Sequence, residues 1–141
     1  MRGSIPQRPI RAFVAYLSRF DMQYLRFESQ ERCEDNASRL GIFHIAYRVR
    51  DAHATRIHDS NEINRLLQWF RDHLHVPDAL ENPQNRRAIC WFKETAHEPT
   101  NRIWTMVPIL KDYGYWIDLR TTRNPGRIVY EDDWQVAAIP R

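Results

Sequence analysis

Basic and hydroxyl side chains that could bind an anion are concentrated in three short stretches, at residues 48–53, 93–97 and 120–123. The planar guanidinium of arginine binds carboxylates and phosphates through two parallel hydrogen bonds, whereas lysine supplies a compact positive charge. The predicted anion-binding residues are Arg48, Arg50, Lys93, Thr95, Arg120, Thr122 and Arg123. The ligand would be a phosphate, a nucleotide, a nucleic-acid backbone or an acidic protein surface.

Two histidines in these stretches, His53 and His97, are candidates for a general acid or base, because imidazole titrates near neutral pH. No metal site is predicted, since the histidine spacing is unspecific and the three consecutive acids at residues 131–133 are typical of a solvated turn. No cofactor is predicted either. With four glycines in the chain, neither a Walker A loop nor a dinucleotide fingerprint can be written.

The elements that would position these side chains follow from the spacing of apolar residues. Alternating apolar residues predict a strand over residues 41–49, with Ile42 and His44 sharing its second face. Helical spacing predicts a helix over residues 60–75, with Asp59 and Glu62 as its capping box. A continuous apolar run predicts a central strand at residues 87–93.

The second half of the chain continues this alternation. A helix is expected from about residue 96 to Gly114, with Pro108 kinking it near Trp104, and a strand follows at residues 115–120. Hairpins are expected at both ends of the chain. The N-terminal hairpin joins residues 11–17 to 22–27 and is followed by an exposed loop at 28–39, and the C-terminal hairpin joins residues 128–130 to 134–139.

This order predicts an α/β or α+β fold, as one domain over residues 1–141 with two main helices, a hairpin at each end, and a mixed sheet built on a central βαβαβ unit. Parallel strands end at one edge of their sheet, so that edge would gather the three basic stretches beside the N-terminus of the second helix. The acidic turn at residues 131–133 should fall at the opposite edge.

Composition sets the remaining expectations. The 141 residues are 43% hydrophobic, which suits one globular domain, and residues 1–9 are expected to be a tag or flexible because MRGS resembles an expression-vector leader. No apolar run approaches the roughly 20 residues that cross a bilayer, so we expect a cytoplasmic protein with no membrane partner. Two cysteines without a CxxC spacing predict no disulfide framework.

The leading hypothesis is a small binding or regulatory module that recognises nucleic acid or an acidic protein through an arginine-rich edge of the sheet, aided by no more than two exposed tryptophans of the five. Two alternatives stay open: a small enzyme acting on a phosphorylated or nucleic-acid substrate, and a structural or oligomerising subunit. A simpler interpretation of the basic stretches also stays open. Their arginines would be solvated and paired with Asp51, Glu94 and Asp118.

Overall fold

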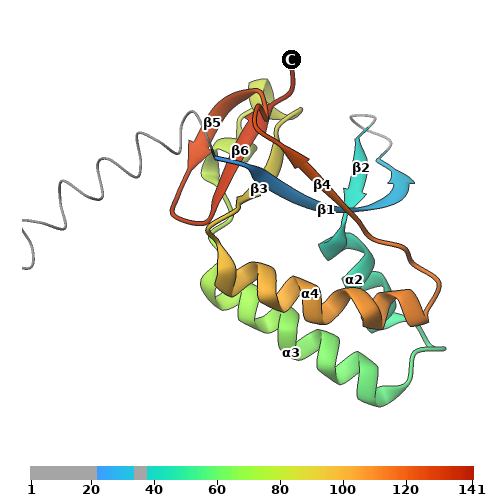
Figure 1. The fold of residues 1–141 in the computed structure, drawn as a ribbon. Coiled ribbons are helices and arrows are strands. Elements are labelled where there is room, and N and C mark those ends of the chain that lie inside the picture. Colours follow the sequence, from blue (N-terminus) through green and yellow to red (C-terminus); the bar gives the residue numbers. More distant parts are fainter. Residues whose placement is uncertain (1–21, 34–37) are drawn as a thin grey trace, which may run out of the picture.

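The structure is a computed structural model that describes residues 22–33 and 38–141. Its strands are β1 (Tyr24–Arg32), β2 (Arg39–Gly41), β3 (Ile89–Lys93), β4 (Asp118–Thr122), β5 (Arg127–Glu131) and β6 (Gln135–Ile139). Its helices are α2 (Ile42–Asp51), α3 (Ile57–His73) and α4 (His97–Asp112), with short 3-10 turns η1 (Asp78–Glu81) and η2 (Pro83–Asn85). The fold is therefore α+β, with the three α-helices gathered on one side of the sheet (Figure 1).

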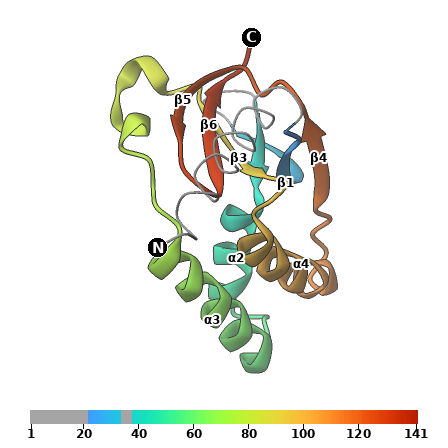
Figure 2. The same ribbon diagram turned by 60° about the vertical axis from the view of Figure 1, so that its left-hand side comes forward.

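The six strands form one sheet in the order β2-β1-β3-β6-β5, and β4 pairs with β1. Figure 2 shows β4 and β5 at the two ends of this sheet. Every pairing among the described strands is antiparallel, so the predicted mixed sheet with parallel neighbours is wrong. The strands β3 and β4 do run in the same direction, as predicted for parallel strands. They are not neighbours, however, because β1 lies between them and is antiparallel to both.

The predicted strand at residues 41–49 is also wrong, because this segment is the helix α2. Its buried residues are Ile42, Ile45, Ala46 and Val49. Their spacing of three, one and three residues places them on one face of a helix, whereas a strand would bury every second residue. Both spacings can be found in GIFHIAYRV, and packing against α3 and α4 selects the helical one. Of the predicted central βαβαβ unit, the first strand is therefore absent, and only the succession β3, α4 and β4 matches its second half.

The later elements were predicted correctly, apart from their ends. The helix α3, the central strand β3, the helix α4 and the hairpin β5-β6 are confirmed. The helix α4 ends before Gly114, whose φ of +92° favours glycine. The turn before β5 also needs its glycine. At Gly126 φ is +114°, and a Cβ atom would lie 2.1 Å from the carbonyl oxygen of Ile139.

Two expectations about the first half of the chain need correction. The exposed loop predicted at residues 28–39 is wrong for its first part, because β1 extends to Arg32 and buries Glu28 and Ser29. The capping box of α3 is absent, since Arg56 occupies the N-cap and Asp59 instead accepts a hydrogen bond from the Tyr113 hydroxyl. The first strand of the predicted N-terminal hairpin lies outside the described residues.

The sheet has a hydrophobic cluster on each face. Phe27 and Phe92 pack against the helices in the main core, which contains fully buried residues such as Ile103 and Met106. Tyr24, Trp91 and Val136 lie on the opposite face, in a smaller cluster with Met22. We call this second side the open face, because none of the described helices covers it (Figure 1). No helix of the described part combines the length and apolarity needed to cross a membrane.

Candidate anion-binding face and an apolar cavity

Two of the predicted anion-binding arginines are on α2, on the helical side of the sheet, and both have acidic partners. Arg48 donates to both carboxylate oxygens of Glu31, at 2.6 and 3.2 Å. This bidentate contact raises the pKa of Arg48 and lowers that of Glu31. Arg50 donates to Asp51 at 2.8 Å. The structure therefore does not bring these two arginines to the predicted site, because their segment is a helix and not a strand.

Lys93 and Thr122 do lie together, at the ends of β3 and β4, where they flank Tyr24 of β1 in register. Lys93 is not available to a ligand, however, because its ammonium lies 2.7 Å from the Glu131 carboxylate and its side chain is 13% exposed. The acidic turn is thus at the same edge as Lys93, contrary to prediction. It lies there because β6 runs antiparallel to β3 and begins beside Phe92.

The two candidate catalytic histidines are far apart. His97 is the first residue of α4, and His53 follows α2 in an exposed turn. The segment after that turn contacts the other end of α4, where the Arg56 backbone N–H donates to the Tyr113 hydroxyl. Sixteen residues of helix span about 24 Å, so the two imidazoles do not share one active site. Thr95 precedes α4 and Arg123 follows β4, both exposed.

The acidic turn has a structural role, which is centred on Asp132. Its carboxylate accepts hydrogen bonds from the Tyr130 hydroxyl and the Gln135 side chain, and from the backbone N–H groups of Trp134 and Gln135. Burial alone would raise the pKa of Asp132, but these four hydrogen bonds together lower it. The hydrogen bond from the Tyr130 hydroxyl to Asp132 raises the pKa of Tyr130 to about 12. Asp133 is exposed beside it.

This geometry predicts how the stability of the hairpin depends on pH. A carboxyl whose pKa is lowered by folding stabilises the protein above its unfolded pKa, and that stabilisation is lost as the pH falls through the folded pKa. We expect Asp132→Asn to lower the free energy of unfolding by about 1–2 kcal/mol at pH 7. The difference from the wild type should shrink below about pH 4. Urea unfolding between pH 2.5 and 7 measures this, and Asp133→Asn, its exposed neighbour, should show neither effect.

Arg120 is the predicted residue that the structure places most favourably. It projects from β4 on the open face with 56% of its side chain exposed, and its guanidinium lies 5.4 Å from the centre of the Trp91 ring. A guanidinium nitrogen also lies 3.8 Å from the buried carboxylate of Glu28. Glu28 in turn accepts from Arg26 Nε at 2.9 Å. We call these three residues the Arg26-Glu28-Arg120 triad, which carries a net charge of +1.

Two polar hollows lie on the open face, one on each side of Arg120. The first, about 560 Å³, is lined by Glu28, Arg32, Ser38, Arg39, Asp118, Leu119 and Arg120. The second, about 290 Å³, is lined by Ile89, Trp91, Arg120, Thr122, Asn124, Pro125, Gly126, Pro140 and Arg141. No acidic side chain among residues 22–33 and 38–141 lines the second hollow. Beside it, the buried indole N–H of Trp91 has no hydrogen-bond acceptor.

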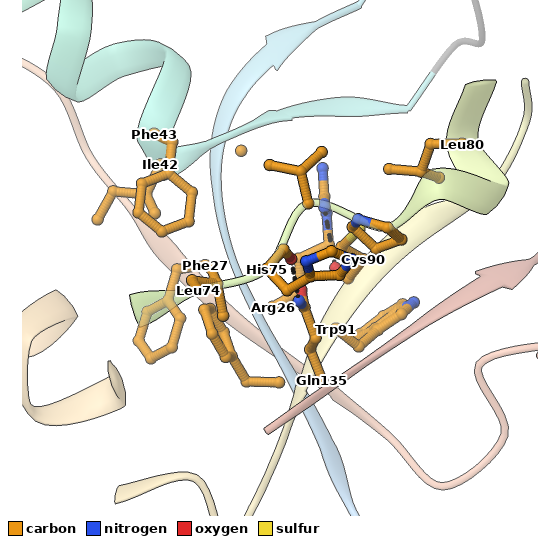
Figure 3. Close-up of a pocket in the computed structure, with 14 residues that line it drawn as sticks. Arg26, Phe27, Ile42, Phe43, Leu74, His75, Leu80, Cys90, Trp91 and Gln135 are labelled. Atoms are coloured by element: carbon orange, nitrogen blue, oxygen red, sulfur yellow. Dashed lines mark hydrogen bonds between the residues drawn. The ribbon is translucent and has the colours of Figure 1, made fainter. Parts of the chain in front are cut away.

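An apolar cavity of about 200 Å³ lies on the helical side of the sheet, between β1, β3, the start of α2 and the segment leading to η1. Figure 3 shows Phe27, Ile42, Phe43 and Leu74 at one end of it, and Arg26, His75, Cys90 and Gln135 together at its centre. The Arg26 side chain reaches between β3 and β2, where it donates to the carbonyl oxygens of Cys90 at 3.2 Å and Arg39 at 2.9 Å.

Sequence reasoning missed the residues that now define these sites, chiefly Arg26, Glu28, Arg32 and Arg39. The predicted loop at residues 28–39 concealed Glu28, Arg32 and Arg39, because its polar composition suggested exposure, whereas Arg26 lay in the strand predicted at residues 22–27 and was given no role. One signal was present: Arg26 and Glu28 are two residues apart, as neighbours on one face of a strand are. The expectation about tryptophans is confirmed, since only Trp104 and Trp116 are exposed.

The described residues contain no group of histidine, cysteine and acidic side chains that could hold a metal ion. Comparisons with protein-family models, with curated proteins and with solved structures find no match for this chain. Its function therefore has to be inferred from its own residues.

Proposed function

We propose that this protein is a binding module that recognises a nucleic acid through the arginines of the open face. The observation that carries the proposal is the position of Arg120 between two polar hollows, with Arg32 and Arg39 on one side and Arg141 on the other. Four guanidinium groups thus line the two hollows, and one of them, that of Arg39, is paired with Asp118 at 3.1 Å. This surface replaces the edge of the sheet that the sequence suggested.

The arrangement favours an extended polyanion over a single anion. The two hollows share Arg120 as their common wall, so a ligand that fills both must pass over this side chain. A nucleic-acid strand carries one phosphate about every 3.4 Å along a duplex and can therefore meet successive arginines. The side chains of Thr122 and Asn124 add polar, uncharged surface to the second hollow.

An acidic protein surface is a weaker match for the same hollows. Protein interfaces are usually centred on buried apolar and aromatic anchors surrounded by a polar rim. The two exposed tryptophans, Trp104 and Trp116, line neither hollow. The open face therefore offers charge and hydrogen-bond donors around Arg120 without an exposed aromatic anchor, which suits phosphates better.

Replacing Arg120 tests the proposal. We expect Arg120→Gln to weaken binding of a single-stranded oligonucleotide about 3–10-fold near 0.1 M salt, because one phosphate contact is lost. The slope of log K against log salt should fall in magnitude by about 0.7. Fluorescence anisotropy across salt concentrations measures both quantities.

The matched control is Arg65→Gln on α3, which removes the same charge from a side chain that is 68% exposed. It should leave affinity and slope close to those of the wild type, because Arg65 lies on the helical side of the molecule. Equal losses in the two variants would show that only net charge matters. A wild-type protein that retains no oligonucleotide at low salt would reject nucleic acid as the partner.

A further inference from the structure

We infer that the apolar cavity behind the sheet is a binding site for a small carboxylic acid with an aromatic or branched aliphatic body. The site is distinct from the proposed nucleic-acid surface, because most of its wall lies on the helical side of β1 and β3, and Trp91 is the lining residue that it shares with the second hollow. Three properties of the cavity carry the inference: its size, its apolar end, and the cation at its centre.

The size suits one ring with a short substituent. An apolar cavity of about 150 Å³ is large enough to bind benzene, and this one measures about 200 Å³. The cavity is partly open to solvent, so a ligand of this size can enter it. The walls at one end are Phe27, Ile42, Phe43, Leu74 and Phe92. These apolar walls favour a ligand whose body is apolar.

The positive charge of Arg26 at the centre of the cavity favours a ligand with a carboxylate group. Within the described part of the chain, Arg26 is the only charged side chain that lines the cavity, and it is mostly buried, with 15% of its side chain exposed. It donates to Glu28, Cys90 and Arg39, which leaves guanidinium N–H groups unused. Because Glu28 is shared with Arg120, the triad keeps a net positive charge that a carboxylate would neutralise.

Two other polar groups of the wall, the Gln135 side chain and the carbonyl oxygen of Cys90, already have hydrogen-bond partners, and the imidazole of His75 also lines the cavity. The Gln135 side chain donates to the carbonyl oxygen of His75 at 2.6 Å and to Asp132 at 3.2 Å. The carbonyl oxygen of Cys90 accepts from Arg26. The guanidinium of Arg26 is therefore the charged donor that a ligand meets at the centre of the cavity. The carboxylate of the ligand would point at Arg26, and its body would lie between Ile42 and Leu74.

Phenylacetate is a suitable probe, and the two cysteines report where it binds. Cys90 lines the cavity, and burial raises the pKa of its thiol, whereas Cys33 lies outside the cavity. We expect millimolar phenylacetate to slow alkylation of Cys90 by iodoacetamide at least threefold at pH 9, with Cys33 unchanged. Peptide mass spectrometry measures both rates in one sample, and ligand-detected NMR measures binding directly.

Two comparisons make the result decisive. Phenylacetamide, which lacks the charge, should bind at least tenfold more weakly; equal binding would overturn the role of Arg26. Leu80→Trp should fill the cavity and abolish binding and protection, whereas Ile57→Trp, at a side chain that is 78% exposed on α3, should preserve both. Absence of binding, or binding that leaves Cys90 unprotected in the wild type, would overturn the inference.

Discussion

Replacing Glu28 with glutamine is expected to lower the free energy of unfolding by about 3–5 kcal/mol, because it leaves a buried cation without its counterion. Glu28 is 2% exposed and is the only carboxylate that contacts Arg26 within the described residues. The guanidinium of Arg26 cannot lose its proton to escape the cost of burial. It also cannot move readily, since it bonds the carbonyl oxygens of two further strands.

Urea unfolding at pH 7 measures this loss, and an exposed ion pair provides the control. Glu62 contacts Arg65 at 2.6 Å on α3, with side chains 30% and 68% exposed. Glu62→Gln should change the free energy of unfolding by less than about 1 kcal/mol, as exposed pairs usually do. If the two glutamine variants were equally stable, the Arg26-Glu28-Arg120 triad would not be a structural element of the fold.

Ile42→Ala is expected to lower the free energy of unfolding by about 2–5 kcal/mol, whereas His44→Ala should change it by less than about 0.5 kcal/mol. Ile42 is 2% exposed at the start of α2, while His44 points to solvent. In a strand these two side chains would lie on the same face and have similar surroundings. In a helix they lie about 200° apart, so only one of them can face the core.

The pair of variants therefore tests the helical assignment of α2 directly. Denaturant unfolding gives the two free energies, and circular dichroism of each variant checks that the helix content of the native state is unchanged. Similar losses for both variants, or a loss confined to His44→Ala, would be incompatible with α2 as described. The comparison needs no ligand.

The Arg26-Glu28-Arg120 triad lies between the two proposed sites: Arg26 and Arg120 are register partners on β1 and β4, and the Arg26 side chain reaches the cavity between β3 and β2. Arg26 lines the apolar cavity on the helical side, and Arg120 separates the two hollows on the open face. Glu28 contacts both arginines and thereby fixes one of them beside each site. A variant of Glu28 would disturb both sites together, which is why Arg120 and Leu80 are the better residues for testing them separately.

Several features of this protein follow from its sequence alone. Each of the elements α3, β3, α4 and the hairpin β5-β6 carries one period of apolar residues that matches its structure, so local patterning is sufficient to identify it. Gly114 marks the end of α4 for a similarly local reason. The combination of helices and strands in one fold followed from the same reasoning.

The direction of the strands and the location of the site were decided by tertiary structure. In GIFHIAYRV both periods are present, and only contact with α3 and α4 determines that Ala46 is buried. The position of β1 between β3 and β4 joins residues about 70 to 100 positions apart, and no local pattern encodes such pairing. Because that pairing places Arg26, Glu28 and Arg120 together, neither proposed site is visible until the chain is folded.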